Sequence, residues 1–166
     1  MANALTIYRI ALSIALLAPD AFSLPFFVIY GLAGLTDILD GLVARTTGTE
    51  SAFGARLDSI ADLVLTITCL MKVLPAISVP TWLWVWAALI ALVKIINVAS
   101  GLVIERHLVL PHTIANKVAG LVAFLVPFAI PMLGITAPAI VACAVATFAA
   151  VQEGHLIRTR TTGPTA

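Results

Sequence analysis

The chain has 166 residues, of which 61% are hydrophobic and 10% are charged, and its formal net charge is +1. Soluble domains are about 45–50% apolar and about 25% charged, so this composition excludes an ordinary soluble domain and indicates a polytopic membrane protein. The nearly neutral charge gives no indication of a nucleic-acid partner. Cys69 and Cys143 both lie in apolar runs, which favours packing residues over a disulfide or a cysteine metal site.

A membrane-spanning helix needs about 20 mostly apolar residues, and six segments approach that length. We therefore predict an all-α fold with six transmembrane helices, over residues 4–19, 23–46, 51–73, 80–104, 112–132 and 136–157. Proline is tolerated at Pro25, near the start of the second segment, whereas Pro127 predicts a kink inside the fifth. These segments form one predicted domain, residues 1–157, followed by a polar tail over residues 158–166.

The N-terminal stretch "MANALTIYRIALSIALLAPDAF" allows a second interpretation as a signal peptide, because a short apolar run precedes small residues near Ala18 and Ala21. However, Asn3, Thr6 and Arg9 follow helical spacing, and Arg9 interrupts the apolar run. We therefore favour a first helix that is retained.

Basic residues predict the orientation in the membrane. Those near one set of helix ends are Arg45, Arg56, Arg106, Lys117, Arg158 and Arg160. At the opposite ends, only Lys72 is found close to a predicted helix end. By the positive-inside rule, we expect a multi-pass protein of the cell (inner) membrane with both termini on the cytoplasmic side.

Four of the five aspartates lie within the 26 residues from 37 to 62. Asp37 and Asp40 are three residues apart and share one face of the second predicted helix, and Asp58 and Asp62 are four apart on the third. Because the connection between these helices is short, we expect antiparallel neighbours whose carboxylate faces meet. The active site is therefore predicted between helices 2 and 3, at the cytoplasmic side.

A charged side chain near the centre of a bilayer costs at least about 2.5–3.5 kcal/mol, so a cluster of carboxylates predicts bound cations. Oxygen ligands favour a hard divalent ion, Mg²⁺ or Mn²⁺. Gly41, Ala44 and Gly54 leave room for a ligand or for close helix contact, and Arg45 is a candidate phosphate partner. Carboxylates, a divalent metal and arginine together favour phosphoryl transfer on a diphosphate.

The stretch from Asp37 to Asp62 has the form Asp-x2-Asp-Gly-x2-Ala-Arg-x8-Gly-x3-Asp-x3-Asp. This motif resembles the signature of the CDP-alcohol phosphatidyltransferase family, and the predicted six-helix layout resembles that family over nearly the whole chain. The stretch "NALTIYRI", with Asn3, Thr6 and Arg9, is similar to the family's frequent N-terminal pattern Asn-x-Leu-Thr-x-x-Arg.

The resemblance implies an enzyme that transfers a phosphatidyl group from a CDP-linked lipid, CDP-diacylglycerol, to an alcohol and releases CMP. By position it implies metal ligands at Asp37, Asp40, Asp58 and Asp62. Asp62 is also the family's candidate for the base that deprotonates the acceptor hydroxyl. The resemblance further implies a cytidine diphosphate pocket lined by Gly41, Ala44, Arg45 and Gly54, and a homodimer in the membrane.

The acceptor alcohol is less well defined by the sequence. Lys94, with Asn97 one turn away, is a candidate either for an acceptor phosphate or for balancing the aspartates, since intramembrane lysines face the protein interior or a wet cavity. Arg106, His112 and Lys117 either form a phosphate site on the cytoplasmic side or serve only as orientation charges.

Many members of the family carry Gly-Lys-x-x-Thr near the start of the fifth helix, where this chain has "NKVAG". Lys117 matches, whereas Asn116 and Gly120 replace the glycine and the threonine. The short length and the N-terminal pattern resemble phosphatidylglycerophosphate synthases, which implies glycerol-3-phosphate as the acceptor. Inositol phosphate, serine and other alcohols remain alternatives.

Two other functions are compatible with carboxylates in a membrane. A divalent-cation transporter explains the acidic residues but not the spacing of glycine, alanine and arginine among them. A catalytically inactive interaction protein is disfavoured because all eight positions of the motif are present.

Overall fold

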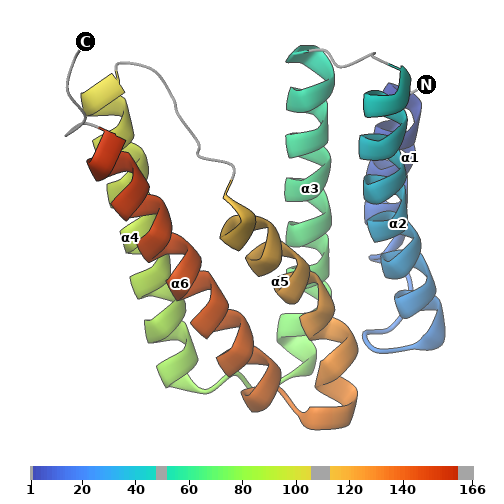
Figure 1. The fold of residues 1–166 in the computed structure, drawn as a ribbon. Coiled ribbons are helices and arrows are strands. Elements are labelled where there is room, and N and C mark those ends of the chain that lie inside the picture. The colour runs from blue at the N-terminus through green and yellow to red at the C-terminus, as the bar shows by residue number, and fades with distance from the viewer. Residues whose placement is uncertain (1, 48–51, 106–112, 161–166) are drawn as a thin grey trace. The chain divides into compact units, whose positions relative to one another are not determined.

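The computed structural model describes residues 2–47, 52–105 and 113–160, and it is all-helical over these ranges (Figure 1). The six α-helices are α1 (Ala2–Ala15), α2 (Leu24–Thr47), α3 (Ala52–Val73), α4 (Thr81–Glu105), α5 (Ile114–Leu133) and α6 (Thr136–Arg160), and the 3₁₀ turn η1 (Leu74–Ala76) follows α3. Within these ranges, the side chains of residues 2–4, 38, 40–47, 52–53, 55–56, 102–105 and 160 are not described. The six predicted helical segments are confirmed as helices.

The largest difference from the predicted boundaries is at the end of the first helix, which stops at Ala15 rather than near residue 19. The chain then turns, and Phe22 takes a left-handed backbone conformation, with φ of 63°. Such a conformation is uncommon for a residue other than glycine. The Phe22 ring contacts those of Phe26 and Phe27, at centroid distances of 6.2 and 6.4 Å. These contacts, together with a hydrogen bond from the Phe26 amide to the Ser23 hydroxyl (3.4 Å), define the start of α2.

The contacts divide the chain into two compact units, residues 1–78 and 79–166. In the first unit, α1 packs against both α2 and α3. The α1 and α3 helices run in the same direction and α2 runs in the opposite one (Figure 1). The buried stripe of α1 consists of Thr6, Arg9 and Ser13, and Leu16 continues it just past the end of the helix, each side chain being no more than 1% exposed. Three of these four side chains are polar, so this face does more than fill an apolar core.

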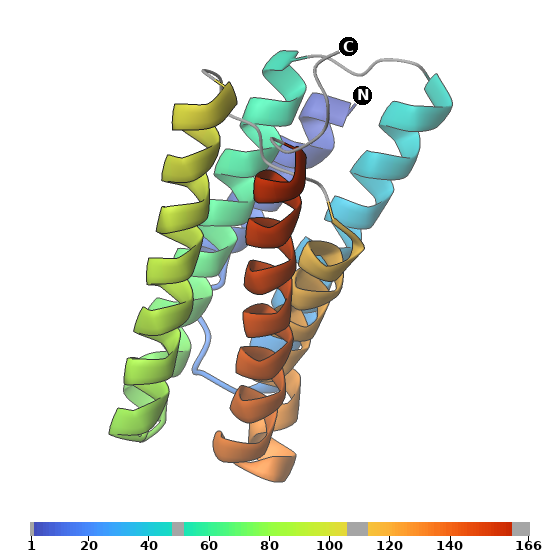
Figure 2. The same ribbon diagram turned by 60° about the vertical axis from the view of Figure 1, so that its left-hand side comes forward.

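In the second unit, α6 packs against both α4 and α5. Figure 2 shows α6 with α4 on one side and α5 on the other. The Trp86 indole donates a hydrogen bond to the Thr147 hydroxyl (3.1 Å), which ties α4 to α6. The α5 helix begins at a cap in which the Thr113 hydroxyl accepts from the Asn116 amide, and it continues through Pro127, so that proline does not end the helix.

Three of the described helices are long and apolar enough to cross a membrane, over Thr81–Gly101, Ile114–Leu133 and Thr136–Thr159. Shorter apolar stretches lie in α1 and α2. Large apolar side chains on these helices point outward, for example Ile95 and Phe148, both 65% exposed. Such extensive apolar exposure fits contact with lipid, because it would be unfavourable in water. The membrane character predicted from composition is thereby supported.

Candidate active site

Three carboxylates of the first unit converge on one buried arginine. Arg9 Nη1 donates to Asp37 Oδ1 at 2.6 Å and to Asp62 Oδ1 at 2.5 Å. Arg9 Nη2 donates to Asp58 Oδ1. The Arg9 side chain is fully buried, so its positive charge is shielded from the surroundings and is matched locally by these anions.

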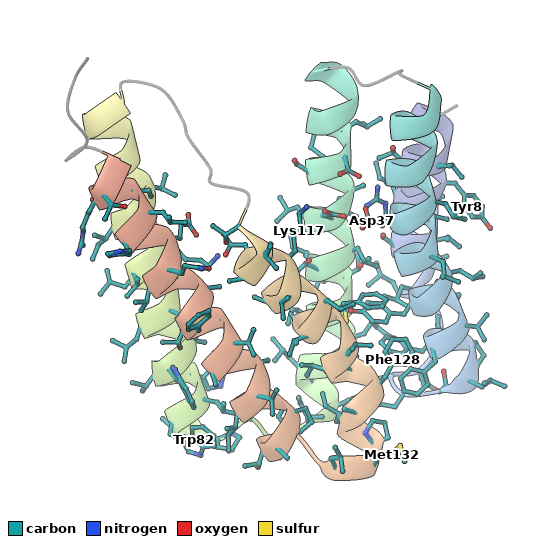
Figure 3. The ribbon with its side chains drawn as sticks, in the orientation of Figure 1. Tyr8, Asp37, Trp82, Lys117, Phe128 and Met132 are labelled. Carbon is teal, nitrogen blue, oxygen red and sulfur yellow. The ribbon has the colours of Figure 1, made fainter. Side chains whose placement is uncertain are left out.

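The direction of the helices explains why these residues meet. Asp37 lies in the second half of α2, whereas Asp58 and Asp62 lie in the first half of α3, one helical turn apart. Because α2 runs opposite to α3, these halves lie at the same end of the unit (Figure 1). Asp37 is found in the region between α2 and α3 (Figure 3). Arg9, midway along α1, reaches both helices because α1 packs on each of them.

The three carboxylates are open on the side away from Arg9. Their side chains are 48% exposed at Asp37, 44% at Asp58 and 57% at Asp62. One oxygen from each lies within 4.8 Å of the others, a separation that one metal ion can bridge. Three carboxylates and one guanidinium leave two formal negative charges, which match a divalent ion. Charge, oxygen donors and openness therefore all fit Mg²⁺ or Mn²⁺.

The predicted meeting of the two carboxylate faces is present for Asp37, Asp58 and Asp62. The side chains of Asp40, Ala44 and Arg45 and the surroundings of Gly41 lie outside the described part of the structure. Gly54 lies in the first turn of α3 and is half-buried. The metal-ligand and catalytic roles assigned to these positions from the motif stay predictions.

The sequence predicts α2 and α3 as neighbours but does not reveal that both of them contact α1. From the sequence, Arg9 is assigned to the N-terminal pattern and to a retained first helix but not to the site, yet it contacts all three aspartates whose side chains are described. A signal for it was present, since an arginine interrupts an otherwise apolar helix and shares a face with Thr6. An intramembrane arginine needs anionic partners, and the aspartates were the evident candidates.

A second polar cluster joins the three helices of the other unit. Lys94 on α4 donates to Asn116 Oδ1 at 3.4 Å, and Asn116 on α5 donates to Glu153 Oε2 at 3.1 Å. Lys94 Nζ lies 3.9 Å from the same Glu153 oxygen. The Glu153 side chain is only 6% exposed, whereas that of Lys94 is 45% exposed. This cluster links α4, α5 and α6 at one level.

The second cluster changes the interpretation of Lys94 and of the departure at Asn116. The described partner of Lys94 is Glu153, an acidic residue that the sequence interpretation did not consider. Asn116, which replaces the family's glycine, is the residue that bridges the two. Glu153 could have been found from sequence as the one acidic residue within the last predicted helix. Such a residue needs a partner in a membrane segment.

The other residues predicted for the acceptor site do not belong to this cluster. Lys117 lies in the first turn of α5 and is exposed (Figure 3). Arg106 and His112 lie outside the described residues. Asn97, one turn from Lys94, is buried and donates to the Ala150 carbonyl at 2.7 Å, so its amide contributes to the packing of α4 on α6.

The apolar helices and the cluster of three carboxylates together define a helical membrane protein with an acidic site. Comparison with known sequences gives the family. The sequence profile of the CDP-alcohol phosphatidyltransferase family matches residues 1–152, and the chain belongs to that family. The assignment made from the motif is therefore confirmed. No solved structure gave a significant match.

Two curated relatives match parts of the chain. One is a CDP-diacylglycerol–serine O-phosphatidyltransferase of Methanocaldococcus jannaschii, 62% identical over 39 residues, which are 24% of this chain and 19% of the relative. The other is a CDP-diacylglycerol–glycerol-3-phosphate 3-phosphatidyltransferase of Cereibacter sphaeroides, 39% identical over 64 residues, which are 39% of this chain and 28% of the relative. Both are named as phosphatidyltransferases, but with different acceptors. The matched stretches cover less than a third of either relative.

Proposed function

We propose that this protein is an integral membrane transferase that moves a phosphatidyl group from CDP-diacylglycerol to a small alcohol and releases CMP. The observation that carries the proposal is the convergence of Asp37, Asp58 and Asp62 in a chain that belongs to this family. Exposed carboxylates are often found close together without any function, but these three come from two helices and all contact the buried guanidinium of Arg9.

Asp37, Asp40, Asp58 and Asp62 would hold the divalent ion, Mg²⁺ or Mn²⁺. When bound, the ion would supply neutralisation of the diphosphate and of the departing CMP. Gly41, Ala44 and Arg45 would line the cytidine diphosphate pocket, with Gly54 giving room on the opposite wall. Arg45 suits this role because its planar guanidinium pairs with two phosphate oxygens at once.

Asp62 would act as the base that removes the proton from the acceptor hydroxyl. Its side chain is 57% exposed, so an incoming alcohol can reach it. Its Oδ1 is bound by Arg9, which fixes the orientation of the carboxylate. The second oxygen, Oδ2, is then the atom that would take the proton, in line with general-base catalysis by a positioned carboxylate.

We propose glycerol-3-phosphate as the acceptor. The longer of the two partial matches is to the relative named for that acceptor. A phosphate-bearing acceptor also needs basic partners, and Lys94 and Lys117 are partly or fully exposed. Arg106 completes the candidate set. Serine is the second candidate, because the relative named for serine has the higher identity. Inositol phosphate is a third.

The proposal includes a topology of six membrane spans with the site and both termini on the cytoplasmic side, and a homodimer. Orientation is supported by the distribution of basic residues. Fusing a reporter that is active only in the cytoplasm to either end tests the topology. Cross-linking in native membranes tests the dimer.

The central experiment is a CMP-release assay on the purified full chain in detergent with Mn²⁺ and CDP-diacylglycerol. Glycerol-3-phosphate, serine and inositol phosphate are supplied one at a time, and release with glycerol-3-phosphate alone is expected. Asp62→Asn should abolish release, whereas Asp20→Asn, an exposed aspartate outside the site, should leave it unchanged. Mn²⁺ flux into liposomes without CMP release for any alcohol would favour the transporter and would reject the proposal.

A further inference from the structure

The buried guanidinium of Arg9 supplies a positive charge on the α1 side of the three carboxylates. We propose that Arg9 is a positioning residue that serves as a built-in counter-ion, holding Asp37, Asp58 and Asp62 together before a divalent ion binds and lowering the affinity of the site for that ion. This inference depends on the proposed function only for the reaction that the site performs.

The first argument is the geometry of the contacts. Two terminal nitrogens of one side chain reach three carboxylates on two helices. A guanidinium can do this because it is planar and carries several donors in a fixed fork, whereas a lysine ammonium is a compact point charge. The three contacted atoms are all Oδ1 oxygens, so the described contacts with Arg9 do not use the second oxygen of Asp58 or Asp62.

The second argument is the difference in exposure across the cluster. The Arg9 side chain is 0% exposed, and the carboxylates are between 44% and 57% exposed. The positive charge therefore lies behind the acidic residues, on their α1 side, and an ion from outside meets the carboxylates first. Tyr8, the residue that precedes Arg9 on α1, is 53% exposed and points away from the carboxylates (Figure 3).

The third argument is that the helices have other contacts that keep them in place. Thr6 and Ser13 are buried along the same face of α1, and Leu16 continues that face just past the end of the helix. The Ser13 hydroxyl donates to the Arg9 carbonyl at 2.8 Å, which adds a local bond within α1. Losing the Arg9 charge should therefore leave the three helices packed, with the three carboxylates no longer fixed by one guanidinium and with a larger excess of negative charge.

A larger excess of negative charge attracts a divalent ion more strongly, because the Coulomb term between near charges is large away from bulk water. Replacing Arg9 should therefore strengthen Mn²⁺ binding but slow CMP release. Arg9→Gln should bind Mn²⁺ at least about tenfold more tightly than the wild type. It should also release CMP more slowly, because nothing but the ion then orients the carboxylates.

The test is titration of the purified full chain with Mn²⁺ in the absence of any lipid, followed by calorimetry or by the electron paramagnetic resonance signal of free Mn²⁺. Arg9→Lys, which keeps the charge, should remain within about threefold of the wild-type affinity. Ser13→Ala is the matched control on the same face of α1, and its affinity should equal that of the wild type. Equal or weaker Mn²⁺ binding by Arg9→Gln would overturn the proposal.

Thermal unfolding covers the case in which Arg9→Gln does not fold. Without metal, Arg9→Lys should melt below the wild type, because an ammonium cannot reach three carboxylates as the guanidinium fork does. Saturating Mn²⁺ should raise both melting temperatures by a similar amount, since the two proteins bind the ion with similar affinity. A metal-free Arg9→Lys that melts at the wild-type temperature would also overturn the proposal. If the wild type releases no CMP while Arg9→Gln binds Mn²⁺ more tightly than the wild type does, the proposed function is rejected and this inference stands.

Discussion

Asn116 donates its side-chain amide to Glu153 at 3.1 Å, which joins the first turn of α5 to the second half of α6. The same asparagine accepts a hydrogen bond from Lys94 on α4. A single amide therefore connects three apolar helices. The position that departs from the family's glycine has a structural role in this chain.

Removing the Glu153 carboxylate should destabilise the protein. Glu153→Ala removes the carboxylate that accepts from the Asn116 amide and is expected to lower the free energy of unfolding by about 1–2 kcal/mol. Glu153→Gln keeps an oxygen that can accept from Asn116, so this variant should lose less of the free energy of unfolding. Thermal unfolding in detergent measures both, and equal losses in the two variants would contradict a role for the hydrogen bond.

A methyl group at Gly154 should disturb the packing of α6 on α4. A Cβ there would lie 2.6 Å from Asn97 Oδ1, closer than real contacts allow. Asn97 would have to move and would weaken its hydrogen bond to the Ala150 carbonyl. We expect Gly154→Ala to destabilise the protein by about 1–3 kcal/mol, as overpacking does.

Gly120→Ala is the matched control for that substitution, since a Cβ there meets no other part of the described chain within 4 Å beyond its own helical turn. Alanine is favoured over glycine in a helix by about 1 kcal/mol, so this variant should be as stable as the wild type or slightly more so. A loss at Gly120 as large as that at Gly154 would show that the effect does not come from contact with Asn97. Both variants are compared by thermal unfolding.

Replacing one carboxylate of the active site should weaken metal binding. Asp58→Asn removes an anionic ligand and should reduce Mn²⁺ affinity by about 10–100-fold, with a similar or larger fall in CMP release. Asp20→Asn, outside the site, is the control and should match the wild type. Unchanged Mn²⁺ affinity in Asp58→Asn would remove that residue from the metal site.

Chelation should stop the reaction reversibly. Adding excess EDTA is expected to abolish CMP release by the wild type, and either Mg²⁺ or Mn²⁺ should restore it. The divalent ion should also raise the melting temperature of the wild type, because a ligand that binds only the folded state stabilises it. CMP release that persists after exhaustive chelation would argue against a metal-assisted mechanism.

Much of the local structure was predictable from the sequence because local patterns encode it. Long apolar runs separated by polar or proline-containing stretches gave the six helices, and Ala52–Val73 and Thr136–Arg160 begin within a residue of the predicted starts. The exception is the early end of α1, which is followed by a turn in which Phe22 takes a left-handed conformation, and apolar content does not reveal that turn.

The candidate site was predictable in part. Spacing along one helix places Asp58 and Asp62 on a common face, and a short connection brings Asp37 to the same end of the unit. That α1 lies against both helices does not follow from spacing, because it depends on which faces pack together. Arg9 was therefore missed as a site residue, because 28 and 53 positions in the sequence separate it from its partners Asp37 and Asp62.

The sequence by itself determined the class of protein, the helical segments and the family, because composition, apolar run length and the spacing of eight motif positions are properties of short stretches. Only the tertiary structure decided which charges meet. Arg9 pairs with three aspartates and Lys94 with Glu153. The physical reason is that a charge in an apolar helix must find its counter-charge on another helix, and the packing of helix faces selects that partner.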